Sequence, residues 1–243
     1  MEILNLYTNR SQLPYELEKF AQYINGYKNS SIIKLINDLH EDKKKVRILD
    51  FGCGRGELLK VLKENGYDNI FGIDFDKHCV ELSSGFAKVF GSVEEFKNSI
   101  NNELVDVVIL SQVMEHLQDP AFTLREIKSV TKKFIIIAVP NPLATITLFR
   151  ALIRKPESGH CTHFWSWEAG ELRNFLEVHN NLKIIKWTGD YVSIFPYGFA
   201  SKVLPDFMLV CINRFLCILE AFILRLIFPF FVCTLICLCE KQD

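Results

Sequence analysis

The chain has 243 residues, of which 49% are hydrophobic and 23% are charged, with 28 basic and 29 acidic side chains. This length and apolar content suffice for one large domain with a sizeable core. The balanced charge, without a long run of Lys or Arg, argues against binding to a nucleic-acid backbone.

Two amphipathic helical patterns open the chain, from Pro14 to about Asn25 and from Ser30 to His40. In the second pattern, Ser31 is placed to cap a face of Ile and Leu side chains. No strand pattern precedes residue 46. We therefore expect residues 1–45 to form a helical cap beside a main domain that spans 46–243.

An apolar strand pattern at 46–51 runs into three glycines, and a helical pattern follows at once. The junction reads Asp50-Phe51-Gly52-Cys53-Gly54-Arg55-Gly56. Glycines let the backbone approach a ligand closely, and a helix N-terminus presents unpaired N–H groups, so the junction predicts a site for a nucleotide-like ligand. The dinucleotide fingerprint needs its third glycine where Glu57 stands, which disfavours a nicotinamide-dependent oxidoreductase.

Short apolar strands alternate with helical segments from residue 46 to about 187, and one further strand pattern follows. The expected strands lie at 46–51, 69–74, near 90, 104–111, 134–141, 182–187 and 230–239. The expected helices lie at 57–64, 76–84, 93–99, 121–130 and 167–178. Such alternation with near-continuous Val, Ile and Leu runs predicts an α/β fold whose parallel sheet is buried on both faces.

Five of these segments, in this order, resemble the motifs of class I S-adenosylmethionine-dependent methyltransferases, in particular their small-molecule branch. The glycine loop resembles the first motif, and Asp74 stands at the end of the second strand. The turn at 115–120 is similar to the E-H-L-x-D-P turn of that branch. The resemblance implies a seven-stranded, mostly parallel Rossmann-like sheet with an antiparallel last strand, and S-adenosyl-L-methionine as the methyl donor.

The resemblance also implies which residues contact the donor. The methionine end would lie against Asp50, Gly52, Cys53, Gly54 and Gly56, the ribose and adenine against Asp74 and Phe75, the adenine edge against Ser92, Val93 and Glu94, and the far wall would be Ser111 and Gln112. A carboxylate can accept hydrogen bonds from both ribose hydroxyls at once. The family usually has Asp at the position of Ser92, and Cys53 is expected to be a small residue that fits the loop.

Two histidines are candidates for a general base, which a hydroxyl acceptor needs near neutral pH. His116 follows the fourth strand, at the edge where open α/β sheets bind ligands. His163 lies in a loop that faces the acceptor in similar small-molecule and glycan-pathway methyltransferases. In the alternative, Glu115 and His116 only stabilise a turn and His163 bonds the backbone, while Ser166 caps the next helix.

Neither histidine predicts a metal site by itself. Quinone and catechol-like O-methyltransferases that resemble this segment hold ligands in an E-x-x-E-H pattern, but Gln112 stands where the first acid belongs. His160 and His163 flank a cysteine, yet no partner pair at zinc-finger spacing appears elsewhere. We therefore expect no metal ion.

The stretch before the last strand is unusually apolar. As a helix, residues 206–225 would confine their polar side chains to an arc of about 140°. The uncharged run Leu226–Cys239 contains Pro229 and is shorter than the roughly 20 residues that a membrane-spanning helix needs. We expect a hydrophobic helical insertion at about 191–228 that packs on the core or in a homodimer, with a peripheral membrane or a lipid-linked acceptor as the alternative.

The compartment follows from the cysteines and the N-terminus. Eight cysteines in a chain whose first residues lack a basic start and an apolar run predict free thiols in the cytoplasm.

The predicted activity is methyl transfer to a small-molecule or lipid-linked acceptor, at oxygen. The rival hypothesis is a catalytically silent S-adenosylmethionine-binding or membrane-associated scaffold subunit.

Overall fold

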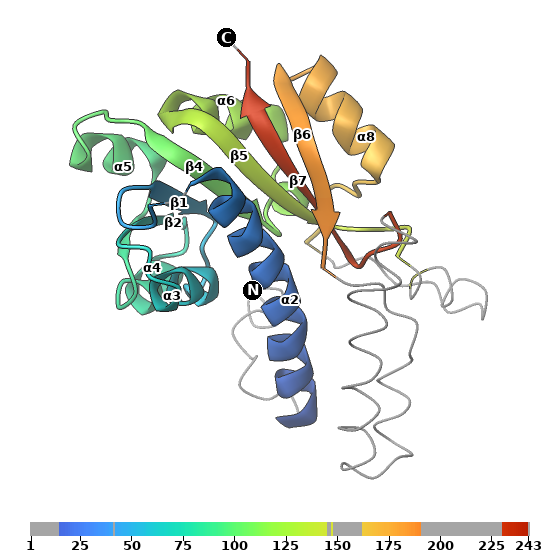
Figure 1. The fold of residues 1–243 in the computed structure, drawn as a ribbon, viewed down its shortest axis with the longest axis horizontal. Helices are drawn as coiled ribbons and strands as arrows, with labels where there is room; N and C mark the ends of the chain where they lie inside the picture. Colours follow the sequence, from blue (N-terminus) through green and yellow to red (C-terminus); the bar gives the residue numbers. More distant parts are fainter. Residues whose placement is uncertain (1–14, 41, 145–146, 148–161, 191–229, 243) are drawn as a thin grey trace.

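A computed structural model describes the chain except for residues 1–14, 41, 145–146, 148–161, 191–229 and 243. Its centre is a seven-stranded sheet with the order β3-β2-β1-β4-β5-β7-β6 (Figure 1). The strands are β1 (Arg47–Phe51), β2 (Asn69–Ile73), β3 (Lys88–Phe90), β4 (Val105–Ser111), β5 (Thr131–Pro140), β6 (Leu182–Gly189) and β7 (Thr234–Lys241). β1 to β5 pair in parallel, whereas β7 is antiparallel to both β5 and β6. The predicted mostly parallel sheet with an antiparallel last strand is confirmed.

Helices cover both faces of this sheet (Figure 1). They are α2 (Tyr15–Leu39), α3 (Glu57–Glu64), α4 (Lys77–Ser83), α5 (Val93–Ser99), α6 (Pro120–Val130) and α8 (Ala169–Arg173). A 3-10 turn, η2 (Met114–His116), follows β4, and α8 continues into a π-helical turn, η3 (Asn174–Val178). The helices expected at 57–64 and 93–99 have the predicted bounds.

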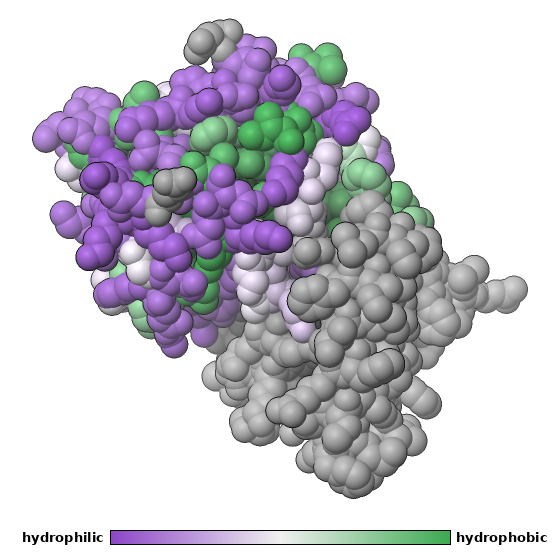
Figure 2. All heavy atoms as spheres, viewed as in Figure 1, coloured by the Kyte–Doolittle hydropathy of each residue, from purple (hydrophilic) through white to green (hydrophobic). Residues whose placement is uncertain are grey.

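The apolar residues of the strands alternate between two cores, one on each face. In β4, Val107 and Ile109 belong to the core that α2 and α3 cover, whereas Val108 and Leu110 belong to the core under α5, α6 and α8. Successive strand residues point to opposite faces, so a continuous apolar run fills both cores. Hydrophilic residues predominate on the visible surface of the described part (Figure 2).

The N-terminal region contains one helix of 25 residues where two were expected. Gly26 lies inside α2 and weakens the helical pattern without ending it, because an isolated Gly costs only about 1 kcal/mol relative to Ala. Ser31 does not cap a helix; its hydroxyl donates to the carbonyl oxygen of Gly189 at 2.8 Å. Lys186 forms an ion pair with Asp38 at 2.8 Å. Both contacts join α2 to β6.

Several other boundaries differ from the expectations. β7 begins four residues later than predicted, at Thr234, and ends at Lys241. The helix predicted at 167–178 begins at Ala169, and its N-cap is Glu168, not Ser166, because the Glu168 carboxylate accepts the N–H of Glu171. No helix in the described part of the chain is both long and apolar enough to cross a membrane. The predicted insertion at 191–228 lies outside the described residues.

Candidate active site

The glycine loop lies at the carboxyl end of β1 and is held against the end of β2. The N–H groups of Gly52 and Cys53 donate to the carbonyl oxygen of Ile73 at 2.8 and 3.0 Å. A Cβ at Gly52 would lie 2.5 Å from the Val113 side chain, whereas a Cβ at Gly54 would meet no atom within 4 Å. Gly54 has φ of 52°, so the loop needs glycine there for its conformation and leaves the backbone open to a ligand.

Asp74 follows β2 and lies beside this loop, as predicted. Its carboxylate accepts the N–H of Gly54 at 2.7 Å and the N–H of Asp76 at 3.0 Å. The neighbouring Phe75 ring is 67% exposed and contacts Phe51 edge-on, with ring centroids 5.9 Å apart. The loop thus has an oriented carboxylate and an exposed aromatic ring at its edge.

A cavity of about 140 Å³ opens under the glycine loop. It is lined by Lys28, Asn29, Asp50, Gly52, Cys53, Gly54, Arg55, Glu57, Leu58 and Ser111. The hydroxyl oxygen of Ser111 is buried without a hydrogen-bond partner. Sites for whole ligands usually measure about 300–1,000 Å³, so this cavity suits one end of a nucleotide-sized ligand, with the rest along Asp74 and Phe75.

A larger hollow of about 410 Å³ lies at the β3 edge of the sheet. It is lined by Phe71, Ser84, Ala87, Lys88, Val89, Phe90, Ser99 and Ile100. None of these residues belongs to the glycine loop or to the carboxyl end of β4. The smaller cavity is therefore the better candidate for the site.

The cavity under the glycine loop is lined by an acidic and a basic side chain, Asp50 and Lys28. Burial raises the pKa of Asp50 to about 7, Lys28 opposes this shift, and Asp74 adds to it. Burial also lowers the pKa of Lys28, which is opposed by the carboxyl groups of Asp50, Glu57, Asp190 and Glu115. An acidic and a basic group that line one cavity suit the two charged groups of a zwitterionic ligand. Lys28 was not among the residues predicted for the site, because α2 precedes the glycine motif and no spacing rule joins the two.

The segment expected at the adenine edge turns from β3 into α5. The Ser92 hydroxyl caps α5 by accepting the N–H of Glu95 at 3.1 Å. The Val93 side chain is buried in the core, and Glu94 is exposed. A contact between Val93 and a ligand would therefore come from its backbone.

Gln112 stands at the carboxyl end of β4 in a strained conformation. Its φ is 60°, which is uncommon for a residue other than glycine. Its N–H donates to the carbonyl oxygen of Ala138 at 2.8 Å. Such strain often marks functional sites, and here it turns the chain into η2.

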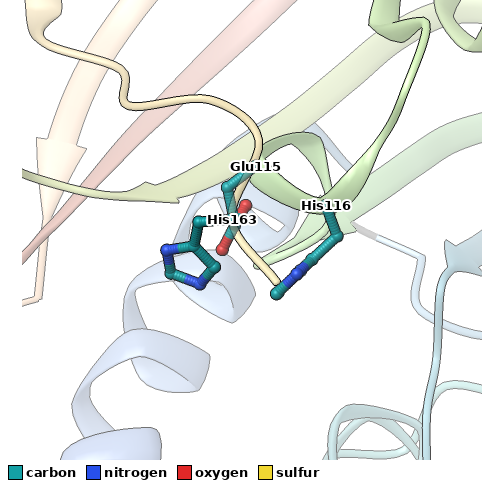
Figure 3. Close-up of side chains that lie close together, drawn as sticks. All are labelled: Glu115, His116 and His163. Atoms are coloured by element: carbon teal, nitrogen blue, oxygen red, sulfur yellow. The ribbon is translucent and has the colours of Figure 1, made fainter. Parts of the chain in front are cut away.

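Glu115, His116 and His163 form a cluster next to this turn (Figure 3). One ligand-type atom of each side chain lies within 4.8 Å of those of the other two. The rings of His116 and His163 meet edge to face, with centroids 4.7 Å apart. The two predicted catalytic histidines thus belong to one cluster, although α6, β5 and most of the segment after β5 separate them in the sequence.

Backbone hydrogen bonds hold the two halves of the cluster together. Phe164 and Trp165 donate their N–H groups to the carbonyl oxygen of Glu115 at 2.8 and 3.3 Å. Nδ1 of His116 lies 3.1 Å from the carbonyl oxygen of Thr162. The loop that carries His163 is therefore fixed on η2. His160 lies outside the described residues.

Glu115 is the buried member of the cluster, with 1% of its surface exposed. Burial raises the pKa of its carboxyl group to about 7, while a backbone hydrogen bond and Lys28 oppose the shift. Its Oε2 atom is buried and has no hydrogen-bond partner. A carboxyl group and two imidazoles are groups that can accept a proton from a ligand.

Cys53 fits the loop as a small buried residue. Burial raises the pKa of its thiol to about 12, and Asp50 adds to the shift. A thiol with such a pKa is not ionised near neutral pH and is a poor nucleophile. Cys237 and Cys239 are also free and buried, whereas Cys233 is half-buried.

The sequence matches a family model described as a methyltransferase domain over residues 17–186. The chain is 34% identical over 104 residues to a ubiquinone biosynthesis O-methyltransferase of Rickettsia canadensis, which covers 40% of this chain and 42% of that protein. It is 31% identical over 140 residues to the protein of the same name from Rickettsia prowazekii, covering 54% of each. The matched stretches thus span about half the length of these relatives.

Solved structures show the same fold at low identity. The magnesium protoporphyrin IX methyltransferase from Synechocystis PCC 6803 superimposes with a TM-score of 0.61 at 12% identity, covering 99% of this chain and 94% of that one. A SAM-dependent methyltransferase from Archaeoglobus fulgidus gives a TM-score of 0.51 at 20% identity, with 94% and 100% covered.

Proposed function

Because this chain belongs to the family of methyltransferase domains, we propose that it transfers a methyl group from S-adenosyl-L-methionine to a hydroxyl oxygen of a small-molecule or lipid-linked acceptor. One observation carries the proposal. The cavity under the glycine loop and the Glu115–His116–His163 cluster adjoin each other, since Ser111 lines the cavity four residues before Glu115 and the Val113 side chain packs against Gly52. A donor site and a proton-accepting group therefore share the carboxyl edge of β1 and β4.

The residues of the cavity fit the donor in chemical type. Asp50 would bind the α-ammonium of its methionine end, and Lys28 the α-carboxylate. Ser111 offers a buried hydroxyl without another partner. Asp74 would accept the ribose hydroxyls, and Phe75 would lie against the adenine.

The reaction is a displacement at the methyl carbon. The acceptor oxygen forms a bond to this carbon as the carbon–sulfur bond breaks, and the electron pair stays on sulfur to give S-adenosylhomocysteine. The hydroxyl proton passes to the Glu115–His116–His163 cluster. Because the sulfonium is already activated, holding the reactants in line supplies most of the acceleration, on the order of 7–11 kcal/mol.

Two observations favour oxygen as the acceptor atom. The cluster supplies bases, which a hydroxyl needs, and the relatives are named O-methyltransferases. The apolar sequence of residues 206–225 supports a lipid-linked acceptor, but it lies outside the described residues. We therefore propose a hydroxyl group on a small-molecule or lipid-linked acceptor.

The histidines provide the test. Changing His116 or His163 to Gln should lower kcat by roughly 10²–10⁴-fold and leave the affinity for S-adenosylhomocysteine unchanged, because the cluster acts on the acceptor. Turnover would be followed as S-adenosylhomocysteine release with phenolic acceptors, and affinity by calorimetry. His179→Gln is the matched control, since His179 is exposed after η3. Near-full turnover of both variants would contradict a role in proton transfer.

A further inference from the structure

We propose that Glu115, His116 and His163 bind a divalent transition-metal ion, with His163 as the ligand that completes the site. From the sequence alone we expected no metal ion, because Gln112 occupies the position where the E-x-x-E-H pattern has its first acid. In the folded chain His163, which comes from another segment, supplies a third metal ligand.

The geometry of the cluster is close to that of a coordination sphere. The three ligand atoms lie within 4.8 Å of one another (Figure 3). Ligand atoms bonded to one zinc ion at about 2.1 Å lie roughly 3.4 Å apart, so small rotations of the side chains would close the site. Hydrogen bonds from Phe164 and Trp165 to the Glu115 carbonyl already fix the two segments at this distance.

A second observation also points to a ligand at this place. Glu115 has 1% of its surface exposed, and its Oε2 atom has no hydrogen-bond partner. A buried carboxylate oxygen without a partner is costly, because it loses its hydration. An ion bound to this oxygen would remove that cost.

The orientation of His116 suits coordination. Its Nδ1 faces the carbonyl oxygen of Thr162 at 3.1 Å, which fixes the proton on Nδ1 and makes Nε2 the basic nitrogen. Metal-bound histidines usually donate their other ring N–H to such an acceptor, which sets the tautomer and the ring plane.

The chemical type of the three metal ligands indicates which ion would bind. Two imidazole nitrogens and one carboxylate suit zinc, cobalt or similar ions, whereas magnesium prefers oxygen ligands. Three protein ligands also leave a coordination position open, as in catalytic zinc sites. With an ion bound, the three side chains would be ligands and not proton acceptors, and the ion would itself lower the pKa of an acceptor oxygen that it binds. This use rests on the proposed function, but ion binding itself does not.

Cobalt(II) is the direct probe, because its visible d–d absorption reports on nitrogen coordination without donor or acceptor. The metal-free full chain should bind one cobalt ion, and zinc should displace it while excess magnesium should not. His163→Ala and Glu115→Gln should each weaken cobalt binding by at least about 100-fold, since even partners outside the coordination sphere change affinity by about 10–100-fold. His179→Ala, the control, should bind cobalt as the unaltered chain does.

Binding of S-adenosylhomocysteine, measured on the same samples, shows that each variant is folded. The proposal is overturned if the unaltered chain gives no cobalt absorption, if both cluster variants keep full cobalt affinity, or if magnesium displaces cobalt as readily as zinc. In each of these cases intact S-adenosylhomocysteine binding would leave the proposed function standing. Loss of that binding in the unaltered chain would instead count against the proposed function.

Discussion

Lys28 shows how a single residue can define one end of a site without a motif. Its ammonium interacts with Asp50, Glu57, Asp190 and Glu115, although α2 precedes all four of them in the chain. We expect it to bind the α-carboxylate of the donor. Its effect should then depend on whether the ligand has an amino-acid end.

Changing Lys28 to Met should weaken binding of S-adenosylhomocysteine by about 10–100-fold, the effect of a lost hydrogen bond to a charged group. Binding of 5′-methylthioadenosine, which lacks the amino-acid end, should stay unchanged. Calorimetry with both ligands measures the difference. Asp74→Ala is the matched control, because it should weaken both ligands through the shared ribose. Equal losses for the two ligands in Lys28→Met would refute the assignment.

Asp50 should make the stability of the ligand-free protein depend on pH. Burial raises its pKa from 3.8 to about 7, so between these values the folded protein keeps a proton that the unfolded chain has released. The free energy of unfolding therefore falls as pH rises from about 4 to 7, by up to roughly 4 kcal/mol from this residue. In Asp50→Asn this contribution should be absent, and urea unfolding at several pH values would detect the difference. If the free energy of unfolding depended on pH in the same way in both proteins, the raised pKa of Asp50 would be contradicted.

At the level of helices and strands, most of the fold could be predicted from the sequence. The central strands are long apolar runs, and their alternation with amphipathic segments leaves few other folds. Boundaries that depend on tertiary contacts were predicted less well. The sequence suggested two helices separated between Asn25 and Ser30, whereas α2 is continuous from Tyr15 to Leu39 and its C-terminal half is joined to β6 by Ser31 and Asp38.

Substitution by Ala should change the stability of the protein in opposite directions at Gly26 and at Gly56. Gly26 is exposed in the middle of α2, and a Cβ there would meet no atom within 4 Å. Gly26→Ala should therefore raise the free energy of unfolding by about 0.5–1 kcal/mol. Gly56 has φ of 80°, and a Cβ there would lie 2.8–2.9 Å from Phe86 and Ser83, so Gly56→Ala should destabilise the protein. Thermal unfolding checks both, and destabilisation by Gly26→Ala would argue against the continuous helix.

Across the whole chain, the donor side of the site was predictable and the acceptor side only in part. Asp50 lies in the last part of β1, and the glycines and Asp74 follow the ends of β1 and β2, all at strand ends that the sequence reveals directly. The convergence of Glu115 with His163 brings together two segments that are far apart in the sequence, and no local pattern predicts it. The two histidines therefore looked like rival candidates, whereas the fold makes them neighbours.

The most direct test is the transfer of a deuterated methyl group from S-adenosyl-L-methionine to acceptors in an extract of the protein's own host, with products identified by mass spectrometry. We predict that the label enters a small or lipid-linked molecule and is bound to oxygen, and that Asp74→Ala reduces this labelling at limiting donor. If the protein binds S-adenosylhomocysteine tightly but labels no acceptor, it is a silent binding subunit. Label on nitrogen or carbon would contradict the hydroxyl acceptor.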